Sequence, residues 1–221
     1  MEDKIKILFE DSHIVVCVKP RGVPVQPDPS GAEDLLSYLQ SQRDEVYLIH
    51  RLDRGVGGVL VFAKTKMVAA ALSKQVAEKG NFRKTYHAVA TGKPQENGVL
   101  LDFLYHDKRL RKAFVVKGKR GGVKEASLTY TTLATTQLNG EEVSLLEIAL
   151  GTGRFHQIRV QFASRGHSLL GDGKYGSRIK CPLGLWASRL EFTHPVTKES
   201  LSFSHLPDME QPPFHHFAGL L

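Results

Sequence analysis

The sequence predicts an α+β fold with a mixed or mostly antiparallel sheet. Short β-rich segments outnumber helical ones, and the helices are interspersed among them instead of alternating regularly with strands. Asn139-Gly140 lies between two β-rich runs, which is a strong hairpin signal. The 221 residues show no internal repeat and no low-complexity linker, so we expect a single domain over residues 1–221.

Most of the expected elements are strands. They are short runs rich in β-branched and aromatic residues, bounded by turn residues such as Lys19-Pro20-Arg21-Gly22 and the three prolines of 23–31. The tail with Pro212 and Pro213 is expected to be irregular. The expected strands are 14–18, 47–49, 59–63, 85–91, 126–138, 142–150, 190–193 and 200–203.

Three segments have helical character. Leucines at helical spacing predict a helix over 32–43, and another helix is expected over 156–165, closed by Gly166. The clearest helix follows Thr65, a typical N-cap residue. It continues with one apolar face and is expected to stop at Gly80.

The composition is that of an ordinary soluble protein with a basic balance. Hydrophobic residues make up 41% and charged residues 24% of the chain. A formal net charge of +7 favours a polyanionic partner such as nucleic acid. Cys17 and Cys181 form no Cys-x-x-Cys pair, so we expect neither a metal site nor a disulfide framework. The N-terminus has no apolar signal core and no run is long enough to cross a bilayer, so the default location is the cytoplasm, with no membrane partner.

The segment 108–124 carries eight cations and no acidic residue. Three glycines within it indicate a mobile hairpin or loop. A solvated charged loop is one interpretation, and contact with phosphates is the favoured one. The cations are Lys108, Arg109, Arg111, Lys112, Lys117, Lys119, Arg120 and Lys124.

Asp53 lies between Arg51 and Arg54, and a glycine-rich turn follows it. Nearby cations favour the ionised form of a carboxyl group and would also attract a polyanion. A carboxylate that stays charged beside phosphate is a candidate nucleophile. A surface cluster of salt bridges explains the same residues, and from them alone that interpretation stays open.

Two further segments contain glycines next to charged residues. In 151–159, two glycines precede the expected helix, and free backbone N–H groups there would suit an anion. Arg154 and Arg159 lie near the start of this helix. The tight loop 171–176, which contains Asp172, is interpreted as a structural turn.

Taken together, six ordered motifs over about 11–207 resemble the RluA-type family of pseudouridine synthases. They are similar to the family's lysine-proline-glycine strand, its His-Arg-Leu-Asp signature, its Lys-x-Tyr-x-Ala strand, its Gly-Arg-Thr-His-Gln-Ile-Arg segment, its Gly-Asp-x-x-Tyr-Gly loop and its late Leu-x-Phe-x-His-Pro strand. Six motifs in order are far more specific than any one of them. In this chain they lie at 16–22, 50–58, 84–88, 153–159, 171–176 and 190–195.

The chain departs from the family pattern at several positions. The family usually has Thr-Ser-Gly where Val56-Gly57-Gly58 stands here, Phe155 replaces a Thr, and Trp186 stands where a His is common. The missing hydroxyls are expected to weaken hydrogen bonds that hold the loop of Asp53. This bears on rate or substrate choice more than on the presence of the nucleophile.

The resemblance implies a catalytic domain with a central cleft that isomerises uridine within RNA. The bond from the ribose to the uracil nitrogen breaks, and the base rejoins the sugar through carbon-5, so neither a redox cofactor nor a metal is needed. The resemblance assigns Asp53 as the nucleophile or base and Arg159 as its ion-pair partner. Tyr86 would stack on the uracil or assist the late proton transfer. Arg51 would hold the displaced strand or fill the gap left by the flipped base.

The implied partner is structured RNA, either tRNA or ribosomal RNA, bound by a monomer without the N-terminal RNA-binding domain of many relatives. One alternative is an RNA-binding protein of the same fold with weak or no catalysis. Another is a glycosidase, which needs two carboxylates across a sugar, and Asp172 is the other motif-borne acid. The residues expected to bind RNA are Arg51, Arg54, Lys108, Arg109, Arg111, Lys112, Lys117, Lys119, Arg120, Arg154 and His156.

Overall fold

The computed structural model describes residues 5–78 and 81–220, which form two compact units. Unit 1 comprises the described residues of 1–84 together with 186–206, and unit 2 comprises 85–185 and 207–220. Strand β5 passes from the first unit into the second, and strand β10 passes back. The division therefore does not split the chain into two sequential halves, and the single catalytic domain expected from the sequence stays a prediction.

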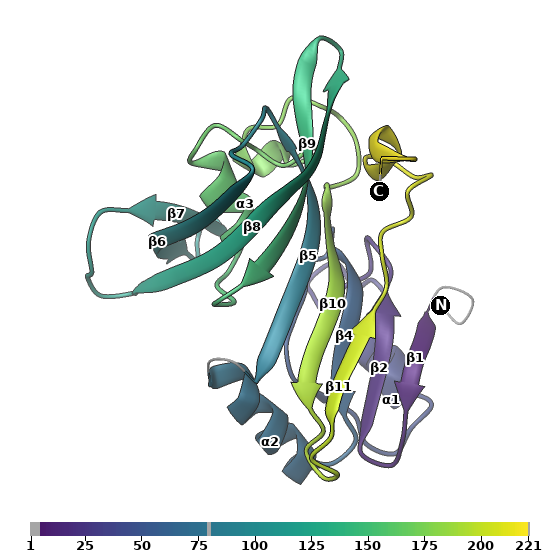
Figure 1. The fold of residues 1–221 in the computed structure, drawn as a ribbon. Coiled ribbons are helices and arrows are strands. Elements are labelled where there is room, and N and C mark those ends of the chain that lie inside the picture. The colour runs from purple at the N-terminus through teal and green to yellow at the C-terminus, as the bar shows by residue number, and fades with distance from the viewer. Residues whose placement is uncertain (1–4, 79–80, 221) are drawn as a thin grey trace. The chain divides into compact units, whose positions relative to one another are not determined.

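Unit 1 is a sheet in the order β1-β2-β4-β10, and β11 pairs with β10 (Figure 1). Strand β3 also pairs with β4. The pairing of β4 with β10 is parallel, and the other pairings of this unit are antiparallel. Its elements are β1 (Lys6–Glu10), β2 (Ile14–Lys19), α1 (Leu35–Gln40), β3 (Tyr47–Leu48), β4 (Gly57–Ala63), α2 (Lys66–Ala77), the start of β5 (Phe82–Thr91), β10 (Leu185–Thr193) and β11 (Ser200–Ser204).

Unit 2 is an antiparallel sheet in the order β5-β9-β8-β6-β7, with helix α3 packed on one face of its β6-β7 end. The packing face of β6 and β7 presents Leu104 and Ala113 to Val160 of the helix. The elements are most of β5, β6 (Asn97–Asp107), β7 (Lys112–Val116), β8 (Val123–Leu138), β9 (Glu141–Leu150), α3 (Gln157–Ala163) and the 3₁₀ turns η2 (Gly173–Tyr175) and η3 (Phe214–Phe217).

The predicted fold class, α+β with a mostly antiparallel sheet, is confirmed. Helix α2 has the predicted N-cap, since the hydroxyl of Thr65 accepts the amide of Val68 at 3.3 Å, whereas the predicted stop at Gly80 lies outside the described residues. Helix α1 is shorter than expected, and it begins only at Leu35 because Asp34 caps it by accepting the amide of Ser37 at 2.9 Å. Cys17 is fully buried in β2, and burial raises the pKa of its thiol to about 12.

The basic segment 108–124 contains a strand that the sequence did not reveal. Strand β7 pairs with β6, so the cations lie mainly in the two turns at its ends, 108–111 and 117–122. Strands β1 and β6 were also not predicted from the sequence, because neither shows regular alternation of apolar and polar residues. Among the described residues, no helix is both long and apolar enough to span a bilayer.

Candidate active site

Asp53 lies in the segment 49–56, which joins β3 to β4 in unit 1. Leu52 and Val56 are buried on either side of it, at 8% and 2% exposure, and fix the segment to the core. The amide of Val56 donates to the carbonyl of Asp53 at 2.9 Å and closes a tight turn. The carboxylate is therefore carried by a short, anchored loop at the beginning of a fully buried strand, a rigid position for a reacting group.

Lys19, at the end of β2, is the main anchor of this loop. Its side chain is fully buried, and its ammonium donates to the carbonyls of Pro20, Val23 and Arg54 at 2.9, 2.7 and 3.1 Å. Burial lowers the pKa of Lys19 to about 7, and the charge of Asp53 opposes that change. Three carbonyls match the three donors of an ammonium group, so the protonated form has all its hydrogen bonds satisfied.

The two arginines that flank Asp53 differ in their surroundings. Arg51 is exposed, and its guanidinium lies 3.4 Å from the side-chain oxygen of Gln26. Arg54 folds onto the loop 22–30, where it donates to the carbonyl of Gly22 at 2.8 Å and to the hydroxyl of Ser30 at 3.0 Å. Arg54 therefore helps to hold the loop in place, a role that its sequence position did not suggest.

The buried His50 and the half-buried Lys84 lie beside one aromatic ring of unit 1. The ring of His50 meets Phe82 edge-on at 5.2 Å, and the ammonium of Lys84 lies 5.2 Å from the same ring. Burial lowers the pKa of His50 well below its usual value, and the charge of Lys84 adds to this. Burial also lowers the pKa of Lys84 to about 8. The histidine of the His-Arg-Leu-Asp signature is thus a neutral core residue at physiological pH.

In unit 2, Arg159 of α3 forms a buried, two-pronged ion pair with Asp172. Its Nε and Nη2 atoms lie 2.7 and 2.8 Å from the two carboxylate oxygens, and the side chains are 12% and 1% exposed. Asp172 also receives the amides of Tyr175 and Ser177 on its carbonyl, so it forms a turn as expected. The sequence interpretation missed its second role, which is to orient the guanidinium of Arg159.

The glycine-rich segment before α3 does not offer the free amides that the sequence suggested. The N–H groups of Gly151 and Thr152 donate to the carbonyl of Ser127, and that of Arg154 donates to the side-chain oxygen of Gln157 at 3.0 Å. The predicted anion site is therefore wrong for these three amides, because a buried glutamine and a neighbouring strand already use them. The side chain of Arg154 is exposed and reaches the carbonyl of Glu125 at 2.9 Å.

His156 precedes α3 with a left-handed backbone and forms part of a stack of rings. Its ring lies 3.8 Å from that of Phe155, which in turn lies 4.0 Å from the ring of His106. The hydroxyl of Tyr175 is 2.9 Å from Nδ1 of His156 and accepts the amide of Ala113 at 2.8 Å. The aromatic side chain of Phe155, where the resembling family has Thr, thus fills the space between two histidines.

Tyr86 is a buried residue of β5, at 7% exposure, and pairs in register with Ile148 of β9. The predicted RNA-binding cations of 108–120 are mostly exposed, although Lys112 is half-buried. Lys119 forms an ion pair with Glu125 at 2.6 Å, and the carbonyl of Arg111 accepts the ammonium of Lys174 at 3.1 Å. Across the described parts of the chain, no group of three His, Cys, Asp or Glu side chains is placed to hold a metal ion.

Comparison with known proteins defines the class to which this fold and these residues belong. Residues 13–164 match the family described as RNA pseudouridylate synthase. The chain therefore belongs to this family and is of its RluA type.

Individual relatives support this assignment. The chain is 32% identical over 206 residues to the "Uncharacterized RNA pseudouridine synthase YhcT" of Bacillus subtilis, covering 89% of this chain and 66% of the relative, just under two thirds of its length. It is 30% identical to the "Dual-specificity RNA pseudouridine synthase RluA" of Vibrio vulnificus, with 96% of this chain and 88% of the relative covered. The solved structure of "Human RNA Pseudouridylate Synthase Domain Containing 1" matches 97% of this chain and 87% of its own with a TM-score of 0.76 at 21% identity, which supports the fold.

Proposed function

We propose that this protein converts specific uridines of structured RNA, in tRNA or ribosomal RNA, into pseudouridine. The observation that carries the proposal is the combination of the family with an intact Asp53 on an anchored loop. In the reaction, the bond between the ribose and N1 of the uracil breaks and a bond to C5 forms. The proton on C5 is lost and N1 gains one, so atoms and electrons balance without an oxidant, a reductant or water. No cofactor or metal is required by this chemistry.

Asp53 is the proposed nucleophile or base that begins the reaction. A carboxylate suits this role only if it stays ionised, and a cation close by favours the ionised form. Lys19 is one such cation within unit 1, because its charge interacts with that of Asp53. Lys19 also holds the carbonyl of Arg54, the next residue, so it acts on the position of the loop as well as on its charge.

Arg159 is the proposed ion-pair partner of Asp53, and Tyr86 the proposed stacking or proton-transferring residue. The two-pronged contact of Arg159 with Asp172 supports a positioning role, because it fixes the plane of the guanidinium. The burial of Tyr86 in β5 supports a fixed ring orientation. Both assignments rest on the motifs that the chain shares with the family.

RNA binding is assigned to exposed cations. A target uridine must leave its helix at a cost of about a few kcal/mol, which phosphate contacts offset. Arg51 is suited to hold the displaced strand, since it is exposed two residues before Asp53. Arg54, Arg154, His156 and the cations of 108–120 complete the proposed surface. We propose that the protein acts as a monomer in the cytoplasm.

The decisive experiment measures pseudouridine formation in a bulk unmodified tRNA or ribosomal RNA transcript by tritium release or mass spectrometry. Asp53→Asn and Asp53→Ala are expected to form no pseudouridine, while their RNA affinity stays within about twofold of the native protein. Glu33→Gln, at an exposed carboxyl outside the catalytic loop, is the control and is expected to be fully active. Full activity of either Asp53 variant would remove the nucleophile assignment, and an inactive native protein that still binds RNA would favour the binding-only alternative.

Two further variants separate chemistry from binding. Arg159→Ala is expected to lose turnover and keep RNA affinity; loss of affinity with intact single-turnover chemistry would make Arg159 a phosphate ligand instead. Neutralising Lys108 and Lys117 with glutamine should flatten the salt dependence of RNA binding by about 1.4 units of slope on a double logarithmic plot for single strands. The matched control neutralises the exposed Lys66 and Lys74 of α2 and is expected to leave the slope unchanged.

A further inference from the structure

The face of the unit 2 sheet opposite to α3 carries an unusual row of apolar side chains. Strand alternation places Val99, Leu101, Phe103 and Tyr105 of β6 on this face, because Leu100 and Leu104 are buried on the other. Val99 is 65% and Leu101 70% exposed, although both are large aliphatic residues. Phe114 of β7, which is 36% exposed, lies directly across from Tyr105. A contiguous patch of exposed apolar side chains marks a surface that binds a partner.

Each ring of this row has a cation beside it. The ammonium of Lys119 lies 5.9 Å from the ring of Phe103, the guanidinium of Arg120 lies 5.9 Å from Tyr105, and the ammonium of Lys112 lies 5.7 Å from Phe114. Rings on which bases can stack, next to cations that can reach phosphates, are the combination by which proteins hold single-stranded nucleic acid.

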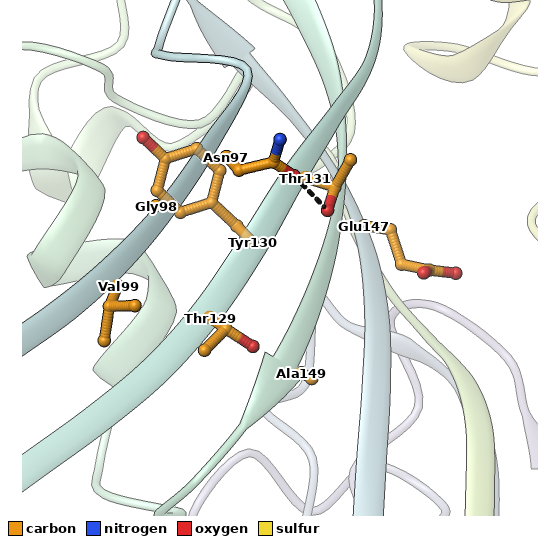
Figure 2. Close-up of a pocket in the computed structure, with 8 residues that line it drawn as sticks. All are labelled: Asn97, Gly98, Val99, Thr129, Tyr130, Thr131, Glu147 and Ala149. Carbon is orange, nitrogen blue, oxygen red and sulfur yellow. Dashed lines mark hydrogen bonds between the residues drawn. The ribbon is translucent and has the colours of Figure 1, made fainter.

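The row continues into an open groove on the same sheet, about 430 Å³ in volume. Figure 2 shows Val99, Thr129 and Ala149 on the three neighbouring strands that form its floor. Glu147 lines it as well, and the hydroxyl of Thr131 donates to the side-chain oxygen of Asn97 at 2.9 Å. From Val99 to Tyr105 the surface runs along about 20 Å of strand. That length suits a site of about four nucleotides, the small end of known single-strand sites.

We infer that this surface, formed by Val99, Leu101, Phe103, Tyr105 and Phe114 with their neighbouring cations, binds an unpaired segment of RNA. It is called the stacking face below. The choice of RNA as the ligand rests on the proposed function. The stacking face would give the protein a second hold on its substrate, on nucleotides outside the target site. Such a hold would favour RNAs in which the target uridine is followed or preceded by an unpaired stretch.

Charge argues against a second copy of this chain as the occupant. The carboxylates next to the aromatic part of the stacking face are those of Glu125 and Asp107. Glu125 is ion-paired with Lys119 at 2.6 Å, and Asp107 accepts the amide of Leu110 at 2.9 Å. The turns at both ends of β7 add further cations, so two such surfaces facing each other would repel. A polyanion with flat apolar groups satisfies both the charges and the rings.

The test measures binding of a fluorescein-labelled 12-nucleotide oligoadenylate, which contains no uridine to enter the catalytic site. Tyr105→Leu and Phe114→Leu keep an apolar side chain but remove the ring, and each is expected to weaken binding about five- to 150-fold. Tyr38→Leu, a half-buried tyrosine of α1 in unit 1, is the matched control and is expected to bind as the native protein does. Circular dichroism of each variant confirms that it is folded.

The remaining outcomes overturn the inference. Unchanged affinity in both ring variants, or a native protein that does not bind the oligoadenylate, would show that the stacking face holds no RNA. Binding that depends on the cations but not on the rings would indicate ordinary phosphate attraction. Self-association of the native protein in sedimentation that the ring variants abolish would make the face a contact between copies. Pseudouridine formation on a short stem-loop is assayed in parallel. An active protein that does not bind the oligoadenylate would disprove the stacking face alone, whereas the proposed activity is tested separately by Asp53→Asn.

Discussion

Gly57 and Trp186 are expected to be energetically coupled, and this is the sharpest prediction that the fold allows. The two residues are paired in the parallel contact of β4 with β10. A Cβ atom added to Gly57 would lie within 3.0 Å of three carbons of the Trp186 indole ring, closer than carbon atoms can approach without movement. The backbone conformation of Gly57 does not require glycine. The absence of a side chain at this position instead leaves room for the indole ring.

The perturbation is Gly57→Ser, which restores the residue that the family usually carries at this position. Overpacking of this kind costs about 1–3 kcal/mol of the free energy of unfolding. In the background Trp186→His, the space is free and the same serine should cost less than about 0.5 kcal/mol. The difference between the two costs is a coupling energy of about 0.5–3 kcal/mol, which is the range found for residues in contact. Trp186→His alone is expected to be destabilising, because the indole N–H donates to the carbonyl of His205 at 2.7 Å.

The assay is urea unfolding followed by circular dichroism, since Trp186 is the one tryptophan of the chain and its fluorescence is lost in the variants. Gly121→Ser is the control, because a Cβ atom there would meet no heavy atom within 4 Å. An equal cost of Gly57→Ser in both backgrounds would refute the reasoning. So would a cost in the native background that is no larger than that of the control.

Three charged side chains with defined surroundings, Asp172, Lys19 and Glu10, lead to further predictions. Asp172→Asn breaks the buried pair with Arg159, so it should lower the free energy of unfolding by about 3 kcal/mol in urea titrations. It should also reduce turnover in single-turnover assays while RNA affinity is kept. Equal stability of variant and native protein would show that the pair is dispensable. Burial lowers the pKa of Lys19 from 10.5 to about 7, so the unfolded state binds more protons between these pH values and the free energy of unfolding should rise from pH 7 to pH 10.5. Denaturant titrations of Lys19→Met should lack this rise. Identical pH profiles of the native protein and the variant would contradict the prediction. The hydrogen bond from Arg43 lowers the pKa of Glu10 from 4.5 to about 2. The ionised carboxylate therefore contributes on the order of 1 kcal/mol to the free energy of unfolding above pH 4.5, after solvent screening, and this contribution is lost as the pH falls toward 2. Glu10→Gln should make the stability depend less on pH in this range, and an unchanged dependence would contradict the prediction.

The sequence predicted the fold class and most strands because their periodicity and turn residues are local properties. It missed β1 and β6, which lack regular alternation, and elsewhere it failed where contacts join distant positions. The departures at Gly57 and at Trp186 were visible separately in the sequence, 129 positions apart, but only the pairing of β4 with β10 shows that each accommodates the other. A side chain at position 57 would collide with the ring of Trp186 on the neighbouring strand, so the missing hydroxyl and the larger ring belong together.

The surroundings of the candidate site could be predicted only in part. Asp53 is predicted from its arginine neighbours and from the motif, and this assignment stays a prediction. The loop that carries it is held mainly by Lys19, whose position at the end of a fully buried apolar strand was the available signal. A lysine that continues such a strand must find acceptors or lose its charge. The sequence also treated Asp172 as a turn residue, because nothing local shows that its carboxylate reaches Arg159 in the preceding helix.

Burial divides the cations of this chain into two kinds with different consequences. Lys19 and Arg159 are held by carbonyls or carboxylates inside the units, and their positive charge fixes loops instead of attracting RNA. The cations in the turns flanking β7 are exposed, and those beside Phe103 and Tyr105 stand at rings that also face solvent. Salt screens the second kind and hardly affects the first. Raising the ionic strength should therefore weaken RNA binding steeply, while the rate of pseudouridine formation in the bound complex stays nearly constant. The net charge of +7 sums both kinds of cation and so reports neither RNA affinity nor loop stability alone.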